Sequence, residues 1–339
     1  MGTVFGGLMA RAFWTLGIPL NPLSPSQTSL AMARSRCSAR EIKRFRETPV
    51  HAAVEGFLRA AAETHGPAEG PEPAVDVVVV DTPAKIHRSK GVRCLCSTLN
   101  PPAGSLAEVG GCEAVCSLTP AQHFVVRARD LDPVGCCLLA MELCGTYLLR
   151  PDLPAGFATL PEPLVSVVDL ARQTGRNRGM PGARRALEAL THTCDGSASP
   201  METAVVLLLV LPPELGGHGL PLPRLNEEVP ISSASSRLLG GTRTVRPDIL
   251  WPDAGLDLEY DSRSFHTQHD ADRDRARRSA LQTAGIEPLS LTPQIVGNAA
   301  AFDEVARLVA RRLSMAAETP DPQAQAQLRQ RLLGTHPVW

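Results

Sequence analysis

Two short apolar runs joined by the turn sequence PDAG place the tightest constraint on how this chain can fold. The runs are TVRPDILW (244–251) and LDLEYDS (256–262). Strand-like runs on either side of a Gly-containing turn predict a β-hairpin. Residues two apart in a strand share a face, so Asp257, Glu259 and Asp261 project together. Across the same hairpin, Asp248 can approach Glu259.

The segments around this hairpin alternate between helical and strand patterns. Before it, Ser199 and Glu202 form a capping box that begins an apolar helix. After it come a helix ending at Gly285, a strand at 286–292 and an amphipathic helix at 299–313. The second half of the chain therefore predicts a mixed sheet with flanking helices.

The first half also mixes the two kinds of element. Strand patterns lie at 74–80, 91–99 and 112–118. Thr119 followed by Pro120 marks the start of a helix. The fold class predicted for the whole chain is α/β.

The length of 339 residues suits two domains. A Pro/Ser-rich linker pattern near the start and a polar end flank them. We expect a poorly ordered leader at 1–48, a mixed α/β N-terminal domain of unknown role at 49–195, a second domain at 196–315 and a polar tail at 316–339.

Composition excludes some classes of protein. The net charge of −1 gives no overall basic character, so nucleic-acid binding would need a local patch. The longest apolar run, at 204–211, is far shorter than the roughly 20 residues of a membrane helix. The nine cysteines follow no secretory signal, which favours reduced thiols and a cytoplasmic protein.

The carboxylates of the hairpin are of the type that holds a hard metal ion. Two close carboxylates repel each other unless a cation lies between them, and oxygen ligands suit Mg²⁺. A bound Mg²⁺ can polarise a phosphodiester and activate a water molecule. Asp248, Glu259 and Glu202 are the residues that such a site needs, with Asp248 and Glu259 as the metal ligands.

The stretch PDILW…LEYDSRSFH resembles the PD-(D/E)XK nuclease superfamily, in particular the branch related to very-short-patch-repair endonucleases. In that branch, a helix bearing Glu precedes a strand with Asp and a strand reading Glu-x-Asp-Gly. A His, an Arg-rich helix and another strand follow. The corresponding features here are Glu202, Asp248, Glu259-Tyr260-Asp261, His266, DRDRARR and IEPLSLT.

This resemblance covers roughly residues 199–313 and implies a restriction-endonuclease-like α/β domain, preceded by a smaller mixed α/β N-terminal region. It implies Mg²⁺-dependent hydrolysis of phosphodiester bonds in DNA. In that reaction Asp248 and Glu259 would hold the metal, Glu202 or Asp261 would support it, and His266 would handle the proton. The first half resembles, more loosely, actinobacterial proteins with an abortive-infection antitoxin (AbiEi-type) region, through the motif MELCGTY at 141–147.

The second half departs from the superfamily pattern at two positions. Ser262 stands where the branch has Gly, which predicts a different turn after the acid. A lysine is expected two residues after the Glu, where this chain has Asp261, and the sequence contains no lysine after Lys90. The repair-endonuclease branch relies on histidine instead, which makes His266 a candidate base.

Each residue also has a structural interpretation. Asp248 and Asp261 can be strand-end residues, Glu202 a helix-cap residue, and His266 and His269 surface residues. The arginines of 273–278 can pair with Asp270, Asp272 and Asp274 along one helix. The alternative function is a catalytically inactive nuclease-fold module in a nucleic-acid-binding or antitoxin-like regulator.

Overall fold

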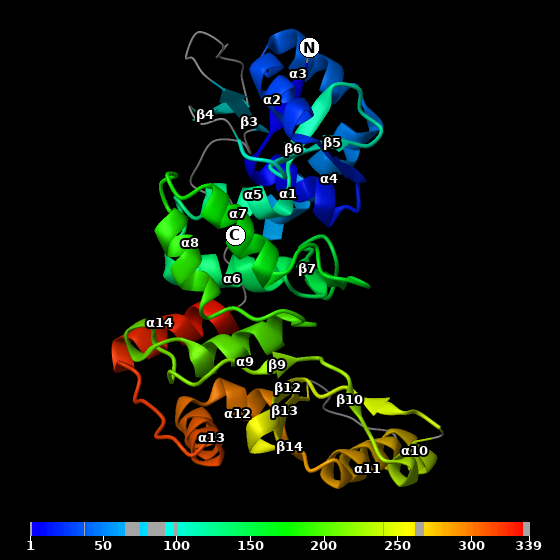
Figure 1. Cartoon of the computed structure of the whole chain (residues 1–339), viewed down its shortest axis with the longest axis vertical. Helices are drawn as coiled ribbons and strands as arrows, with labels where there is room; N and C mark the ends of the chain where they lie inside the picture. The colour runs from blue at the N-terminus through cyan, green and yellow to red at the C-terminus, as the bar shows by residue number, and fades with distance from the viewer. Residues whose placement is uncertain are drawn as a thin grey trace. The chain divides into compact units, whose positions relative to one another are not determined.

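The computed structural model describes residues 2–36, 38–64, 75–80, 92–97, 101–239, 241–261 and 268–334. It is a mixed α/β structure, as the sequence predicts, and divides into two compact units (Figure 1). Unit 1 comprises 1–143, 148–160 and 164–191; unit 2 comprises 144–147, 161–163 and 192–339. The units thus interleave along the chain, which differs from the single predicted boundary after residue 195.

The main sheet of unit 1 joins strands from distant parts of the sequence. These are β1 (Thr3–Phe5), β2 (Leu20–Pro22), β3 (Val75–Val80), β4 (Val92–Ser97), β5 (Leu106–Val109) and β6 (Val115–Leu118). They run in the order β2-β5-β6-β1-β3-β4, with parallel β1/β6 and β3/β4 pairs and antiparallel pairs elsewhere. The three predicted strands of this half correspond to β3, β4 and β6.

Helices and a two-stranded sheet complete unit 1, except that Tyr147, the first residue of β7, belongs to unit 2. They are α1 (Gly7–Thr15), α2 (Pro25–Arg34), α3 (Ala39–Arg46), α4 (Pro49–Thr64), α5 (Pro120–Arg127), α6 (Pro133–Leu143), α7 (Val167–Arg176), α8 (Ala183–Leu190), β7 (Tyr147–Leu149) and β8 (Phe157–Thr159). The predicted helix start at Thr119 is confirmed: its hydroxyl caps α5 by accepting from the Gln122 N–H.

The first 48 residues are not the poorly ordered leader that we expected. Phe5, Met9 and Phe13 are buried in one apolar cluster with Phe45. The rings of Phe5 and Phe45 lie 4.7 Å apart, centroid to centroid. Burial of several large apolar side chains, at about 1.5–3 kcal/mol each, fixes this segment in the core of unit 1.

A buried ion pair links α1 to the MELCGTY motif. Arg11 donates to both carboxylate oxygens of Glu142 at 2.6 Å, and Glu142 also accepts from the Leu149 N–H. The two side chains are 8% and 4% exposed. Breaking such a pair leaves an uncompensated buried charge, so Glu142 has a structural role in unit 1.

Unit 2 contains the predicted hairpin within a small mixed sheet. Its elements up to the hairpin are α9 (Pro200–Val210), η2 (Pro213–Leu215), β9 (Arg224–Leu225), β10 (Val229–Pro230), α10 (Ser233–Leu238), β11 (Thr244–Val245), β12 (Ile249–Trp251), η3 (Pro252–Ala254) and β13 (Leu256–Tyr260). After it come α11 (Gln268–Thr283), β14 (Glu287–Leu291), α12 (Pro293–Gly297), α13 (Ala299–Arg312) and α14 (Pro322–Leu333). The sheet order is β14-β13-β12-β9, with β13 and β14 parallel and the other pairs antiparallel.

The polar segment after residue 315 is not only a solvated tail. Asp321 caps α14 by accepting from the Ala324 N–H at 2.8 Å. Leu328 is buried, and Arg329 donates to the Val296 carbonyl oxygen. These contacts hold α14 against the rest of unit 2.

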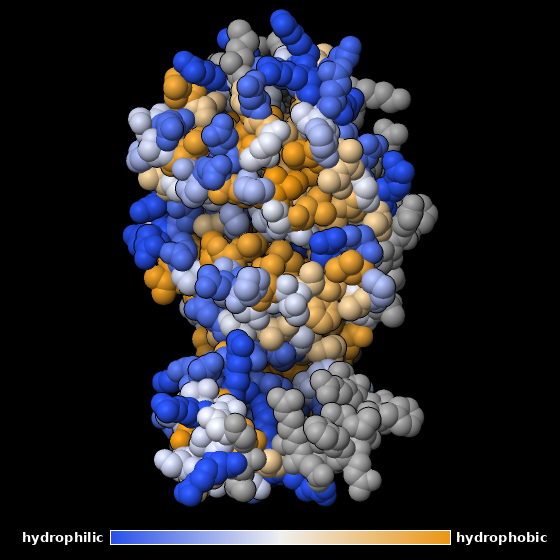
Figure 2. Space-filling model, turned by 90° about the vertical axis from the view of Figure 1, so that its right-hand side faces the viewer, coloured by the Kyte–Doolittle hydropathy of each residue, from blue (hydrophilic) through white to orange (hydrophobic). Residues whose placement is uncertain are grey.

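The surface mixes apolar and polar side chains. On the face shown in Figure 2, hydrophobic patches are broken by hydrophilic residues. In the part of the chain that the structure describes, no helix has both the length and the apolar character needed to cross a bilayer.

Candidate functional site

The hairpin register brings Asp248 and Glu259 together. Ile249 lies opposite Leu258 in the antiparallel β12/β13 pair, so Asp248, one residue before β12, lies opposite Glu259. The short turn is possible because Gly255 adopts a left-handed φ of +55°. The predicted hairpin and the approach of these two carboxylates are both present in the structure.

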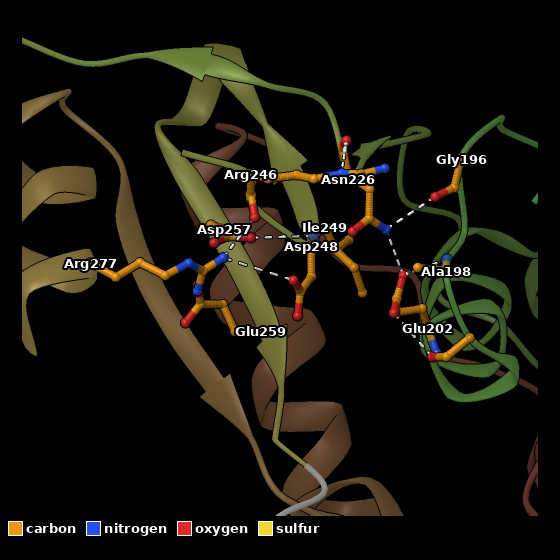
Figure 3. Close-up of polar contacts among 11 residues, drawn as sticks. Gly196, Ala198, Glu202, Asn226, Arg246, Asp248, Ile249, Asp257, Glu259 and Arg277 are labelled. Atoms are coloured by element: carbon orange, nitrogen blue, oxygen red, sulfur yellow. Dashed lines mark hydrogen bonds and ion pairs between the residues drawn. The ribbon is translucent and has the colours of Figure 1, made fainter. Parts of the chain in front are cut away.

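A guanidinium lies between the two carboxylates. Arg277, on α11, donates from Nη1 to Glu259 Oε1, and its Nη2 lies 3.9 Å from Asp248 Oδ1 (Figure 3). Nη2 also donates to the Arg246 carbonyl oxygen at 2.6 Å. The one positive charge of Arg277 therefore lies beside two acidic side chains, and its guanidinium is hydrogen-bonded to the backbone before β12.

Asp257 lies behind this pair, in the interior. Its carboxyl is fully buried; Oδ1 accepts from the Ile249 N–H at 3.2 Å. Oδ2 has no hydrogen-bond donor among the described residues. Burial, followed by the charges of Glu259 and Asp248, raises the pKa of Asp257 to about 8. The protonated carboxyl is the favoured form near neutral pH.

Asp248 also has a perturbed acidity. Burial raises its pKa to about 6, and the nearby carboxylates of Glu202 and Glu259 act in the same direction, whereas Arg277 opposes them. The single guanidinium does not offset burial together with two negative neighbours. The site therefore has a deficit of positive charge around Asp248.

Glu202 lies on the other side of Asp248 from Arg277 (Figure 3). Its carboxylate accepts from the Ala198 N–H at 2.9 Å, the Ser199 hydroxyl at 3.0 Å and Asn226 Nδ2 at 2.7 Å. The Ser199 hydroxyl in turn accepts from the Glu202 N–H. The capping box thus differs from the predicted one, because the carboxylate bonds the backbone of Ala198 and not that of the cap residue.

Asn226 connects Glu202 to the hairpin. Its backbone N–H donates to the Asp248 carbonyl oxygen at 3.1 Å, and its side chain donates to Glu202 and to the Gly196 carbonyl oxygen. Its φ of +51° lies in the left-handed region, which asparagine tolerates better than most residues. The sequence carried no recognisable signal for this role.

Of the remaining predicted site residues, the structure describes Asp261 but not His266. Asp261 lies just after β13, and its backbone N–H donates to the Leu291 carbonyl oxygen at 2.9 Å. His266 lies outside the described residues, as do the side chains of His269 and Arg273. Three residues of the site are outside the predicted set: Asn226, Asp257, which shares the Glu259 face by strand parity, and Arg277, whose predicted partners lie within its own helix.

Asp248 and Glu259 are the residues that could hold a divalent cation in this site. Within the described ranges, no group of three or more His, Cys, Asp or Glu side chains is placed to hold a metal ion. Mg²⁺ commonly uses one or two carboxylates and keeps several waters, so Asp248 and Glu259 fit it. Comparison with protein-family models, with curated proteins and with solved structures gave no match to this chain.

Proposed function

We propose that unit 2 is a metal-dependent nuclease-like domain that hydrolyses phosphodiester bonds in DNA, with Asp248 and Glu259 holding Mg²⁺. The observation that carries the proposal is the approach of these two partly buried carboxylates across the β12/β13 hairpin. Burial first, and then the charges of Glu202 and Glu259, raise the pKa of Asp248, and a bound cation would stabilise its ionised form, which adds support.

The order of elements supports a restriction-endonuclease-like domain. A helix with Glu202 comes first, then Asp248 at the start of β12, then Glu259 in β13. The helix α11 and the strand β14, parallel to β13, complete the order that the sequence resemblance implies.

The proposed roles follow from where the side chains lie. A bound Mg²⁺ would polarise the phosphodiester and lower the pKa of a bound water. Asp248 and Glu259 would bind it, and Glu202 would act on Asp248 through its charge and through Asn226. Asp261 remains a proposed supporting group at the end of β13, and His266 a proposed proton acceptor.

The test is cleavage of plasmid and oligonucleotide DNA by the purified full chain with Mg²⁺ or Mn²⁺. We expect cleavage by the wild type that a chelator abolishes, and a loss of roughly a hundredfold or more in Glu259→Gln, since a ligand charge is removed. Glu287→Gln is the matched control, because Glu287 lies on the neighbouring strand β14 and pairs with Arg312 of α13, away from the two acids. No metal-dependent cleavage by the wild type, or equal cleavage by Glu259→Gln, would overturn the proposal.

One observation favours a second candidate function. Arg277 already neutralises part of the acidic pair, and the superfamily lysine is absent from the sequence after Lys90. A pair of carboxylates that Arg277 already occupies suits a nuclease-fold module that binds nucleic acid without cutting it, as in an antitoxin-like regulator. DNA binding that needs no metal and leaves the DNA intact would favour this candidate.

A further inference from the structure

We propose that Arg277 is a displaceable counter-cation: its guanidinium occupies the cation position between Asp248 and Glu259 and leaves it when a divalent metal ion binds. Arg277 would then set the metal affinity of unit 2. The inference rests on the proposed metal-binding role of the two carboxylates, and it concerns a residue outside the predicted ligand set.

Arg277 contacts one of the two carboxylates more closely than the other, which suits its replacement by a metal ion. It is hydrogen-bonded to Glu259 but lies 3.9 Å from Asp248 Oδ1, beyond hydrogen-bond distance. Its third contact, to the Arg246 carbonyl oxygen, involves no carboxylate. A guanidinium displaced from the acids therefore keeps a neighbouring hydrogen-bond acceptor.

The exposure of the side chain also allows movement. Arg277 is 32% exposed, and its acidic neighbours Asp248 and Glu259 are 28% and 19% exposed. A guanidinium that leaves these acids moves into water, and the carboxylates that it leaves are themselves partly hydrated, so its departure costs less than breaking a buried pair.

The Arg11–Glu142 pair of unit 1 shows the contrasting arrangement. There one guanidinium meets one carboxylate, both are almost fully buried, and Arg11 bonds both oxygens at 2.6 Å. The charges balance one to one. At Arg277 a single positive charge faces two carboxylates, so a divalent ion matches the site better than the arginine does.

Release of Arg277 would have a second effect. The guanidinium would stay on α11, beside the site, with donors that suit two oxygens of a phosphate. Metal binding would thus free a phosphate-binding group at the place where a phosphodiester must lie.

The test is calorimetric titration of the full chain with Mg²⁺ and Mn²⁺ at low salt and near neutral pH. The variants are Arg277→Gln and Arg277→Met; the second keeps much of the apolar stem. The control is Arg278→Ala, since Arg278 is the next residue on α11 and donates to the Ser290 hydroxyl at 3.2 Å. Circular dichroism checks that each variant is folded.

We expect both Arg277 variants to bind metal roughly tenfold or more tightly than the wild type, and Arg278→Ala to bind like the wild type. Folded Arg277 variants that bind metal no more tightly than the wild type would overturn the inference, as would an equal gain in Arg278→Ala. Tighter binding in the Arg277 variants without DNA cleavage by the wild type would support the inference and reject the nuclease proposal. Metal-dependent cleavage by the wild type with unchanged metal affinity in the Arg277 variants would support the nuclease proposal and overturn the inference about Arg277.

Discussion

Glu202 and Asn226 show how single residues hold the site in place. Glu202 lies in the first turn of α9, while Asn226 follows β9, and their side chains are hydrogen-bonded at 2.7 Å. Because the Asn226 N–H also bonds the Asp248 carbonyl oxygen, the helix is linked to the residue that faces Glu259. The position of Asp248 therefore depends on two residues that are distant in the sequence.

This link predicts a stability effect for Glu202. Replacing Glu202 by Ala removes the acceptor of the Ala198 N–H and one of the two acceptors of the Asn226 amide, which we expect to lower the free energy of unfolding by about 1–3 kcal/mol. Glu202→Gln keeps one acceptor oxygen and should lose less. Chemical denaturation measures both, and equal stability of Glu202→Ala and the wild type would contradict the proposed structural role.

At the level of residues, the pairing of the predicted hairpin was sufficient to predict the meeting of Asp248 and Glu259. It could not predict Arg277, because the acidic residues of 270–274 offered that arginine equally good partners within its own helix. The choice between those partners depends on how α11 packs against the sheet. Asn226 was unpredictable for the same reason, since its partners Glu202 and Asp248 lie 24 and 22 residues away in the sequence.

The hairpin is the element that sets the spacing of the site. Gly255 has a φ of +55°, and a Cβ added there would lie 2.4 Å from the Gly285 carbonyl oxygen. Gly285 has a φ of +77°, but a Cβ added there would meet no atom of the described residues within 4 Å. A side chain at Gly285 would therefore introduce backbone strain alone, whereas a side chain at Gly255 would add steric crowding.

We expect Gly285→Ala to cost about 1–2 kcal/mol of unfolding free energy, from the left-handed φ alone. Gly255→Ala should cost roughly 1–3 kcal/mol more, because the methyl group must displace backbone. Denaturant titration of the two variants measures the difference. Equal losses would mean that the turn adjusts freely and does not fix the register of β12 and β13.

Elements whose signal is local were predictable, and elements that depend on distant partners were not. Thr119, Ser199 and the hairpin turn each carry their signal within a few residues. β1, in contrast, has three residues, and its partners β3 and β6 lie about 70 and 110 residues further along the chain. No periodicity in the first 48 residues could reveal that pairing.

The whole molecule carries buried ionisable groups with opposite effects on stability. In unit 1, burial and then the charges of Arg127 and Arg11 hold the pKa of His123 well below its ordinary value of 6.5. The unfolded chain then binds more protons, so unit 1 loses stability as the pH falls below about 6.5. In unit 2, Asp257 keeps its proton to about pH 8 when folded and only to about 3.8 when unfolded, so unit 2 loses stability as the pH rises through that range.

We therefore expect His123 to weaken unit 1 as the pH falls below about 6.5, and Asp257 to weaken unit 2 as the pH rises from about 4 to 8. His218 and His192, whose pKa values burial also lowers, oppose the Asp257 effect in unit 2 at the acid end. Between about pH 6.5 and 8, only unit 2 should lose stability through these groups. Trp14 lies in unit 1 and Trp251 in unit 2, so variants that keep only one of these two among the three tryptophans of the sequence report each unit by fluorescence during denaturation. Asp257→Asn should flatten the pH dependence of unit 2, which can reach about 1.4 kcal/mol per pH unit, and leave unit 1 unchanged. Parallel pH profiles for the two probes would refute this assignment.

The interleaving of the two units along the chain has a consequence for folding during synthesis and for the transfer of gene segments between proteins. The Thr146 N–H bonds the Ser197 carbonyl oxygen at 2.7 Å, and the Tyr147 hydroxyl bonds the Thr203 hydroxyl at 2.9 Å, both within unit 2. A ribosome releases Thr146 and Tyr147 before it has made α7 and α8, which belong to unit 1. Neither unit is complete when the other begins to emerge, and no single cut in the gene would transfer either one intact to another protein.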